Sequence, residues 1–226
     1  MRKQLLMLSA VCLLIVASCS KSNDNPDEQK NNSVSINGAV YSTIQVGNQT
    51  WTSVNYNGAG GANYNDGPND PLIGKLYTLT EAKSVKLPDG WRLPSREDYN
   101  NLLGTLGATD KNTYGFYRPS ANITSKLMAK TSWDNNIGTN ESGFNAYATG
   151  SFNDNSVEPG FRRKGLEANF ITTSFFTELG GSWINIPVAF NIDTEKIDGK
   201  TTTYVAFSDT MVRNNRGSIR FVKDNK

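Results

Sequence analysis

The sequence predicts an α+β fold of mixed or antiparallel strands with two to three short helices. Three observations lead to this class. Two β-rich runs flank Gly47-Asn48 near the start of the domain, helix-start signals fill the middle of the chain, and short β segments separated by polar turns follow Gly143. Strands and helices in separate blocks favour α+β over a wound parallel sheet.

The first elements are two strands over 40–46 and 50–54, joined at Gly47-Asn48. A polar loop over 55–71 and a short strand at Leu76-Tyr77 follow. Thr78 stands three residues before Glu81, the spacing of a capping box, which predicts a helix to about Val85.

The next helix begins after Ser95, which can cap it together with Asp98. Its apolar positions fall on one face, and Gly107 suits its C-terminal cap. These positions are Tyr99, Leu102, Leu103 and Leu106. A third helix is expected over 123–130 and an Asn-rich loop over 133–142. The predicted later strands are 144–149, 168–176, 183–192, 201–207 and 218–222.

The N-terminus reads as a secretory signal, with Arg2 and Lys3 before an apolar run over 5–16 that is too short to span a bilayer. Val16-Ala17-Ser18-Cys19 resembles the lipobox of bacterial lipoproteins, which implies cleavage before Cys19 and its acylation, with palmitate among the acyl chains. The alternative is an ordinary secreted protein. The expected organisation is a signal peptide over 1–18, the acylated Cys19 and a disordered tether over 19–33, and one domain over 34–226.

Asp24, Asp27 and Glu28 lie in the tether. An acidic stretch at this place resembles the surface-export signal of Bacteroidetes lipoproteins, although it also suits a merely soluble linker. The expected location is the outer membrane, reached through the lipid anchor, with the cell surface or the periplasmic face left open.

Composition excludes several classes of function. Removing the signal takes Arg2 and Lys3 from 23 basic residues, which leaves 21 against 21 acidic ones. A neutral chain lacks the basic footprint of nucleic-acid binding. The chain has no histidine, and its two cysteines are Cys12, lost with the signal, and Cys19. No His- or thiolate-based catalysis, disulfide, metal site or cofactor is therefore expected.

Four segments in order resemble the Fibrobacter succinogenes major paralogous domain. They are Ile44-Gln45-Val46-Gly47-Asn48-Gln49-Thr50-Trp51, Trp91-Arg92-Leu93-Pro94-Ser95, Ser142-Gly143-Phe144-Asn145-Ala146 with Ala148-Thr149-Gly150, and Gly217-Ser218-Ile219-Arg220-Phe221-Val222-Lys223-Asp224. The resemblance implies a C-type-lectin-like fold related to the formylglycine-generating enzymes. Their reactive cysteine pair is missing here, so that activity does not carry over. Two departures, at Phe221 and Asn169-Phe170, concern a possible disulfide and packing.

Residues that carry chemistry by type have structural explanations. The candidate acids are Glu81, Glu97, Asp98 and Glu141. Of these, Glu81 and Asp98 are expected to act as helix-capping residues. The oxygen-rich stretches at Asn65–Asp70 and 134–136 match no calcium motif and are expected to turn the chain. In Trp91-Arg92-Leu93-Pro94-Ser95, Trp91 and Leu93 are expected in the core and Arg92 beside a carboxylate.

The predicted ligand-binding residues lie in the late loops, where lectin-like folds present their contacts. They are Trp183, Asn185, Arg213, Asn214, Asn215 and Arg216. Trp183 suits the core equally well. The leading hypothesis is a membrane-anchored, non-catalytic domain that binds a glycan or a protein. The alternatives are a carboxylate-based polysaccharide hydrolase and a structural subunit of a surface assembly.

Overall fold

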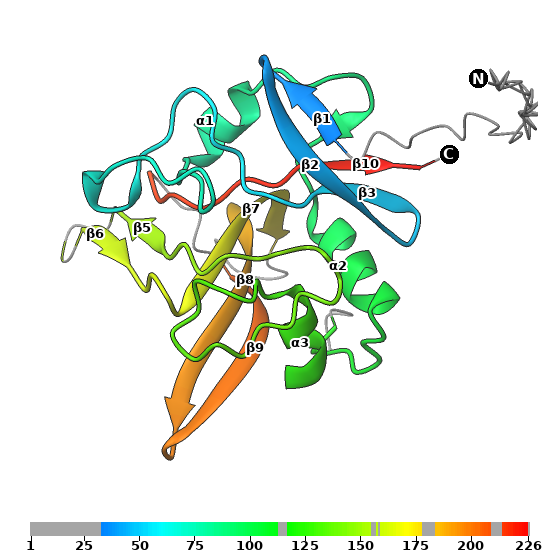
Figure 1. Ribbon diagram of the computed structural model, residues 1–226, viewed down its shortest axis with the longest axis vertical. Helices are drawn as coiled ribbons and strands as arrows, with labels where there is room; N and C mark the ends of the chain where they lie inside the picture. Colours follow the sequence, from blue (N-terminus) through cyan, green and yellow to red (C-terminus); the bar gives the residue numbers. More distant parts are fainter. Residues whose placement is uncertain are drawn as a thin grey trace, which may run out of the picture. The chain divides into compact units, whose positions relative to one another are not determined.

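The computed structural model describes residues 33–112, 117–154, 157, 159–177, 184–208 and 214–225, and of Thr177, Ile184 and Asn185 the backbone alone. Within these residues, three sheets with antiparallel strand pairing combine with three short α-helices (Figure 1). The arrangement confirms the predicted α+β class.

The largest sheet joins both ends of the domain. Its strands are β1 (Ser33–Ile36), β2 (Ala39–Val46), β3 (Gln49–Thr52), β4 (Trp91–Arg92) and β10 (Val222–Asp224), in the order β1-β2-β3-β10-β4. The predicted turn between β2 and β3 is present, with Gly47 at φ 60°. The structured part begins one residue before the expected boundary, since Ser33 pairs with Ser42.

Three α-helices follow from local capping signals. They are α1 (Leu79–Ser84), α2 (Arg96–Thr105) and α3 (Ala121–Leu127). The predicted capping boxes of Thr78 with Glu81 and of Ser95 with Asp98 are both formed. The third helix starts two residues earlier than expected, because Ser120 caps it by accepting from the Ile123 amide, and it ends at Leu127.

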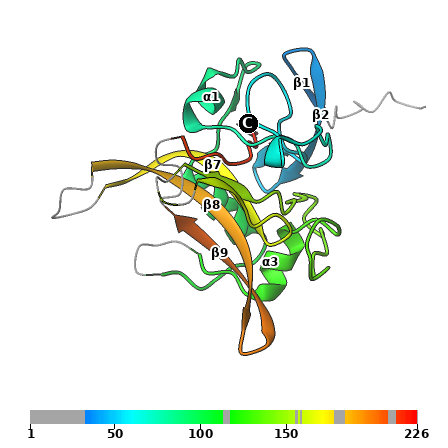
Figure 2. The same ribbon diagram turned by 90° about the vertical axis from the view of Figure 1, so that its left-hand side faces the viewer.

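A three-stranded sheet carries the long strands of the second half. It consists of β7 (Glu167–Thr177), β8 (Ile184–Ile197) and β9 (Lys200–Ser208). These strands confirm three of the predicted β segments. The β8–β9 hairpin extends beyond the last residue paired with β7, and its turn points away from the other elements (Figures 1 and 2).

Two predicted strands are wrong in type or extent. The 144–149 segment has only the Ala146 bridge to Met128. The Ala146 amide donates to the carbonyl of Leu127 at the end of α3, and the Ala146 carbonyl accepts from the Ala129 amide, so the buried segment packs against the end of a helix instead of joining a sheet. The predicted strand over 218–222 is shifted, since β10 starts at Val222. The sequence also missed a small hairpin, β5 (Ser151–Asn153) with β6 (Gly160–Arg162).

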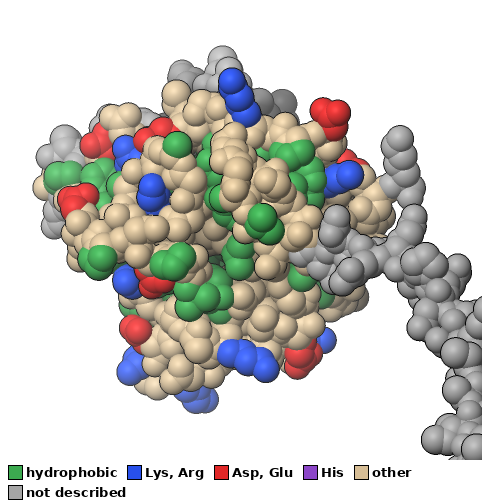
Figure 3. Space-filling model, turned by 45° about the horizontal axis from the view of Figure 1, so that its top comes forward, with side chains coloured by type: hydrophobic (Ala, Val, Ile, Leu, Met, Phe, Trp, Pro, Cys, Tyr) green, Lys and Arg blue, Asp and Glu red, His purple; other side chains and the backbone are tan. Residues whose placement is uncertain are grey.

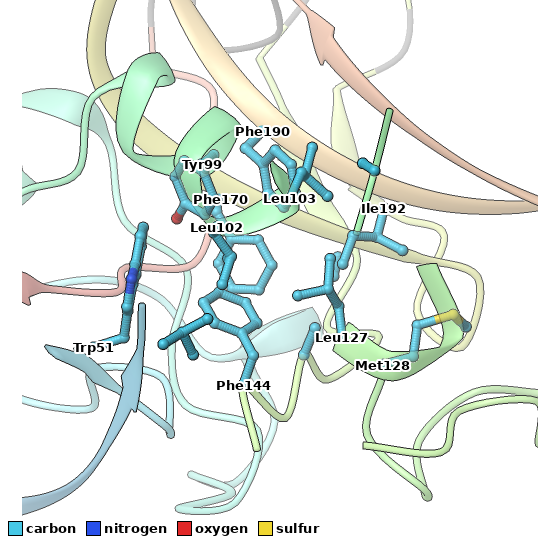
Figure 4. Packing of buried hydrophobic residues seen from close by; sticks show 14 of the residues in the cluster. Trp51, Tyr99, Leu102, Leu103, Leu127, Met128, Phe144, Phe170, Phe190 and Ile192 are labelled. Carbon is cyan, nitrogen blue, oxygen red and sulfur yellow. The ribbon is translucent and has the colours of Figure 1, made fainter. Parts of the chain in front are cut away.

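The core consists of two clusters of buried side chains. In the first, Trp51, Tyr99, Phe144, Phe170 and Phe190 point toward one another (Figure 4), and the Tyr99 and Phe190 rings stack with centroids 4.1 Å apart. Leu102 and Leu103 are buried there as predicted. The second cluster contains Leu93 and Phe221, with Trp91 partly buried against it.

Arg220 ties the two halves of the chain together inside the core. Its fully buried guanidinium donates to Asn55 Oδ1 (2.7 Å) and to the carbonyls of Thr52, Phe144 and Asn145 (2.8 Å each). The Phe144 and Phe170 rings flank it. Burial lowers the pKa of Arg220 to about 9, so it remains charged at neutral pH.

No helix among the described residues is both long and apolar enough to cross a bilayer.

Candidate functional site

The predicted ligand-binding residues are only partly described. Trp183 and Arg213 lie outside the described residues, as does Cys19, and Asn185 is described by its backbone within β8. The remaining three, Asn214, Asn215 and Arg216, come together beside the hairpin of β5 and β6.

Asn214–Arg216 pairs with the end of β5. Phe152 and Arg216 exchange backbone hydrogen bonds of 3.1 and 2.9 Å. Asn215 is buried and accepts from the Asp154 amide (2.7 Å), while the exposed Asn214 donates to Asp154 Oδ2 (2.9 Å). Asn214 is therefore the residue of this segment that presents its side chain to solvent.

Arg216 forms an ion pair that positions the segment. Its Nη1 lies 2.7 Å from Glu81 Oε2, and Glu81 also accepts from the amides of Thr78 and Gly61. Burial raises the pKa of Glu81, but the Thr78 amide and the Arg216 charge outweigh burial, so the pKa is lowered. The carboxylate thus joins the cap of α1 to the late segment.

Three aromatic rings on this side of the molecule belong to neither core cluster. Tyr64, from the 3-10 helix η1 (Tyr64–Asp66), lies 5.2 Å from Phe161 on β6, and Phe161 lies 5.0 Å from Phe152 on β5, centroid to centroid. All three are half-buried, and Lys164 Nζ lies 5.4 Å from the centre of the Tyr64 ring. We call Tyr64, Phe152 and Phe161 the aromatic patch.

Gly150 permits the close packing beneath the aromatic patch. It has φ 69°, and a Cβ there would lie 2.1 Å from the Arg162 carbonyl oxygen and 3.0 Å from Tyr64 Cε2. The patch, with Asn214 and Asp154 at its edge, combines ring faces with amide and carboxylate groups. On the face seen in Figure 3, small groups of hydrophobic side chains also alternate with charges of both signs.

The four candidate acids do not form a catalytic pair. Asp98 is buried and binds Arg92, whose Nη1 lies 2.6 Å from Asp98 Oδ2, together with Ser95 and Gln49. Burial raises its pKa, but the hydrogen bonds from Arg92 and Ser95 prevail and lower the pKa to about 2. Glu81 caps α1, Glu97 is exposed, and Glu141 lies 3.7 Å from Lys126 Nζ.

The Arg92 contacts confirm the expected structural role of its segment, because the guanidinium also lies 2.8 Å from Asp224 Oδ2 on β10. The residues described contain no group of three or more His, Cys, Asp or Glu side chains suited to a metal ion.

The sequence did not predict a pair of carboxylates that the structure brings together on neighbouring strands. Glu167 on β7 and Asp193 on β8 stand opposite each other in the sheet, and both lie against Arg163, at 3.3 and 3.1 Å. Burial, followed by repulsion from Asp193, raises the pKa of Glu167 to about 7. Burial likewise raises the pKa of Asp193. The strand register that pairs them has no local sequence signal.

Comparison with known proteins gives one match. The model of the Fibrobacter succinogenes major domain family matches residues 23–223. Searches of curated proteins and of solved structures found no match. Because the matched region covers most of the 226 residues, the chain belongs to the Fibrobacter succinogenes major domain family.

Proposed function

We propose that this protein is a lipid-anchored, non-catalytic binding protein of the bacterial outer membrane and that its domain binds glycans at the aromatic patch. The anchor follows from the lipobox-like Val16-Ala17-Ser18-Cys19. The acidic tether favours the cell surface as its location. A C-type-lectin-like fold, implied by the family segments, is part of the same proposal.

The aromatic patch is the observation that carries the proposal. Tyr and Phe rings that reach solvent outside the core provide flat apolar faces, on which the C–H face of a sugar ring packs. Asn214 and Asp154 lie within reach of the same hairpin and offer a donor and an acceptor for hydroxyl groups. Ligand sites combine such apolar walls with a few oriented polar groups.

Two predicted ligand contacts, Trp183 and Arg213, extend the same proposal, since they flank β8 and the Asn214–Arg216 segment in sequence. The carboxylates described above favour binding over hydrolysis, because in the facing pair of Glu167 and Asp193 both side chains are held by Arg163. Glu81 and Asp98 are held by helix caps and arginines, whereas a glycosidase needs two carboxyls facing each other across the scissile bond, about 5–9.5 Å apart.

A glycan array probed with the detergent-solubilised full chain tests the proposal. The double variant Tyr64→Ala/Phe161→Ala should lose array binding by about tenfold or more, because stacked rings act as binding anchors. Ile197→Ala, which removes an apolar side chain 52% exposed at the hairpin tip, is the matched control and should bind normally. Undiminished binding by a folded double variant, or no glycan binding by the natural chain, would refute the proposal.

A further inference from the structure

We propose that the cleft beside Arg163 is a second binding site, separate from the aromatic patch, and that it takes an alkylammonium group. The cleft has a volume of about 580 Å³, within the range of ligand cavities. It lies between the 134–135 loop, the turn after β6 and the outer part of the β8–β9 hairpin. Its walls include Asp134, Arg163, Leu166, Thr194, Glu195 and Lys196.

Arg163 forms a rigid wall of the cleft. Its Nε lies 3.3 Å from Glu167 Oε2, and its Nη2 donates to Asp193 Oδ1 (3.1 Å) and to the Thr194 carbonyl (3.3 Å). The residue has φ 58°, a left-handed conformation that is uncommon outside glycine. A side chain fixed at three points holds such a backbone in place. Arg163 Nη1 has no partner among the described residues and can donate to a ligand oxygen.

Asp134 supplies a carboxylate at a fixed place. Its amide donates to the Gly165 carbonyl (2.9 Å), and a Cβ on Gly165 would lie 2.2 Å from Asp134 Oδ1, so the carboxylate rests directly on the turn. Within the described part of the chain, this carboxylate has neither a hydrogen bond nor an ion pair. A bound ammonium would give it a partner.

The charge of the cleft selects a cation. Glu167 and Asp193 stand behind Arg163, while Asp134, Glu195 and Lys196 line the cleft. The lining side chains balance two carboxylates against two cations, so the excess negative charge comes from Asp193 and, above its raised pKa of about 7, from Glu167. Clefts with one sign of charge attract ligands of the other sign.

The shape of the site favours an amine over a metal ion. The half-buried Leu166 provides apolar surface along which methylene groups can pack, as lysine stems do elsewhere. A hard cation instead wants six or more oxygen ligands, and Arg163 already occupies the space between the two buried carboxylates. An alkylammonium needs only the Asp134 carboxylate and the apolar wall.

Calorimetric titration of the detergent-solubilised full chain tests the site with two probes, cadaverine and Nα-acetyl-lysine amide. Binding by both shows that the alkylammonium is recognised. Binding by the lysine amide alone points to a lysine of a partner polypeptide, and binding by cadaverine alone points to a free diamine. Raising the salt from about 0.02 to about 0.3 M should weaken the binding, because screening acts on surface charges.

Asp134→Asn should raise the dissociation constant of the probe by about three- to tenfold, because an exposed ion pair contributes about that much to binding. Asp198→Asn removes an acid from the turn of the same hairpin and should leave affinity unchanged, as should Tyr64→Ala in the aromatic patch. If Asp134→Asn fails to fold, Glu195→Gln is the second variant, because it removes the other carboxylate that lines the cleft. Failure of both probes to bind, or wild-type affinity in the folded cleft variant, would overturn the proposal.

Discussion

Arg220→Met should destabilise the domain severely. The substitution keeps most of the side-chain length but removes the charge and every donor. Four acceptors then lose their partner, namely the buried Asn55 Oδ1 and carbonyls of Thr52 and Phe144, and the part-buried carbonyl of Asn145. Each unsatisfied buried polar group costs about 1–3 kcal/mol.

The loss is partly offset, because methionine does not carry the cost of burying a charge, which amounts to several kcal/mol. The net expected loss is about 3–5 kcal/mol, a large share of the total stability of a domain. Arg220→Lys retains the charge but has three donors for four acceptors and no planar fork, so it should also be destabilising.

Urea unfolding of the full chain, followed by tryptophan fluorescence, measures this effect as a lower midpoint at unchanged slope. Lys200→Met, on an exposed strand end, is the control and should change the free energy of unfolding by less than about 0.5 kcal/mol. A loss below about 1 kcal/mol for Arg220→Met would refute the reasoning, since it would mean that water or neighbouring groups satisfy the four acceptors.

Three further predictions follow from the same structure. The folded protein holds the Glu167 proton more tightly than the unfolded chain, because burial raises that pKa from 4.5 to about 7. The free energy of unfolding should therefore fall as the pH rises from about 5 to 8, by up to roughly 3 kcal/mol, and Glu167→Gln should flatten the profile; an unchanged slope would contradict this. Leu102→Ala should cost about 2–5 kcal/mol in the same urea assay, because the side chain is 1% exposed, and a cost under about 1 kcal/mol would mean that the site repacks freely. Cys19→Ala should abolish metabolic palmitate labelling and release the protein from membranes, whereas persistent labelling would exclude this cysteine as the anchor.

Features set by neighbouring residues were predictable from sequence. The caps at Thr78 and Ser95 each involve a side chain three residues further along the chain. The turn at Gly47 needs a positive φ, which glycine adopts readily. The apolar face of α2 follows from helical periodicity, so the burial of Leu102 and Leu103 was predictable too. The family segments likewise identified Arg92 and its need for a carboxylate, although not which one.

Only the tertiary structure decided the contacts between distant segments of the chain. The sequence indicated many strands after Gly143, yet nothing local states that β10 enters between β3 and β4, or that Glu167 stands opposite Asp193. The aromatic patch combines Tyr64 with Phe152 and Phe161, two residues that lie far from Tyr64 in the chain. Local hydrogen bonds involve a few neighbouring residues and leave a sequence signal. Strand register and ring packing result from the burial of many side chains at once, and no short segment encodes them.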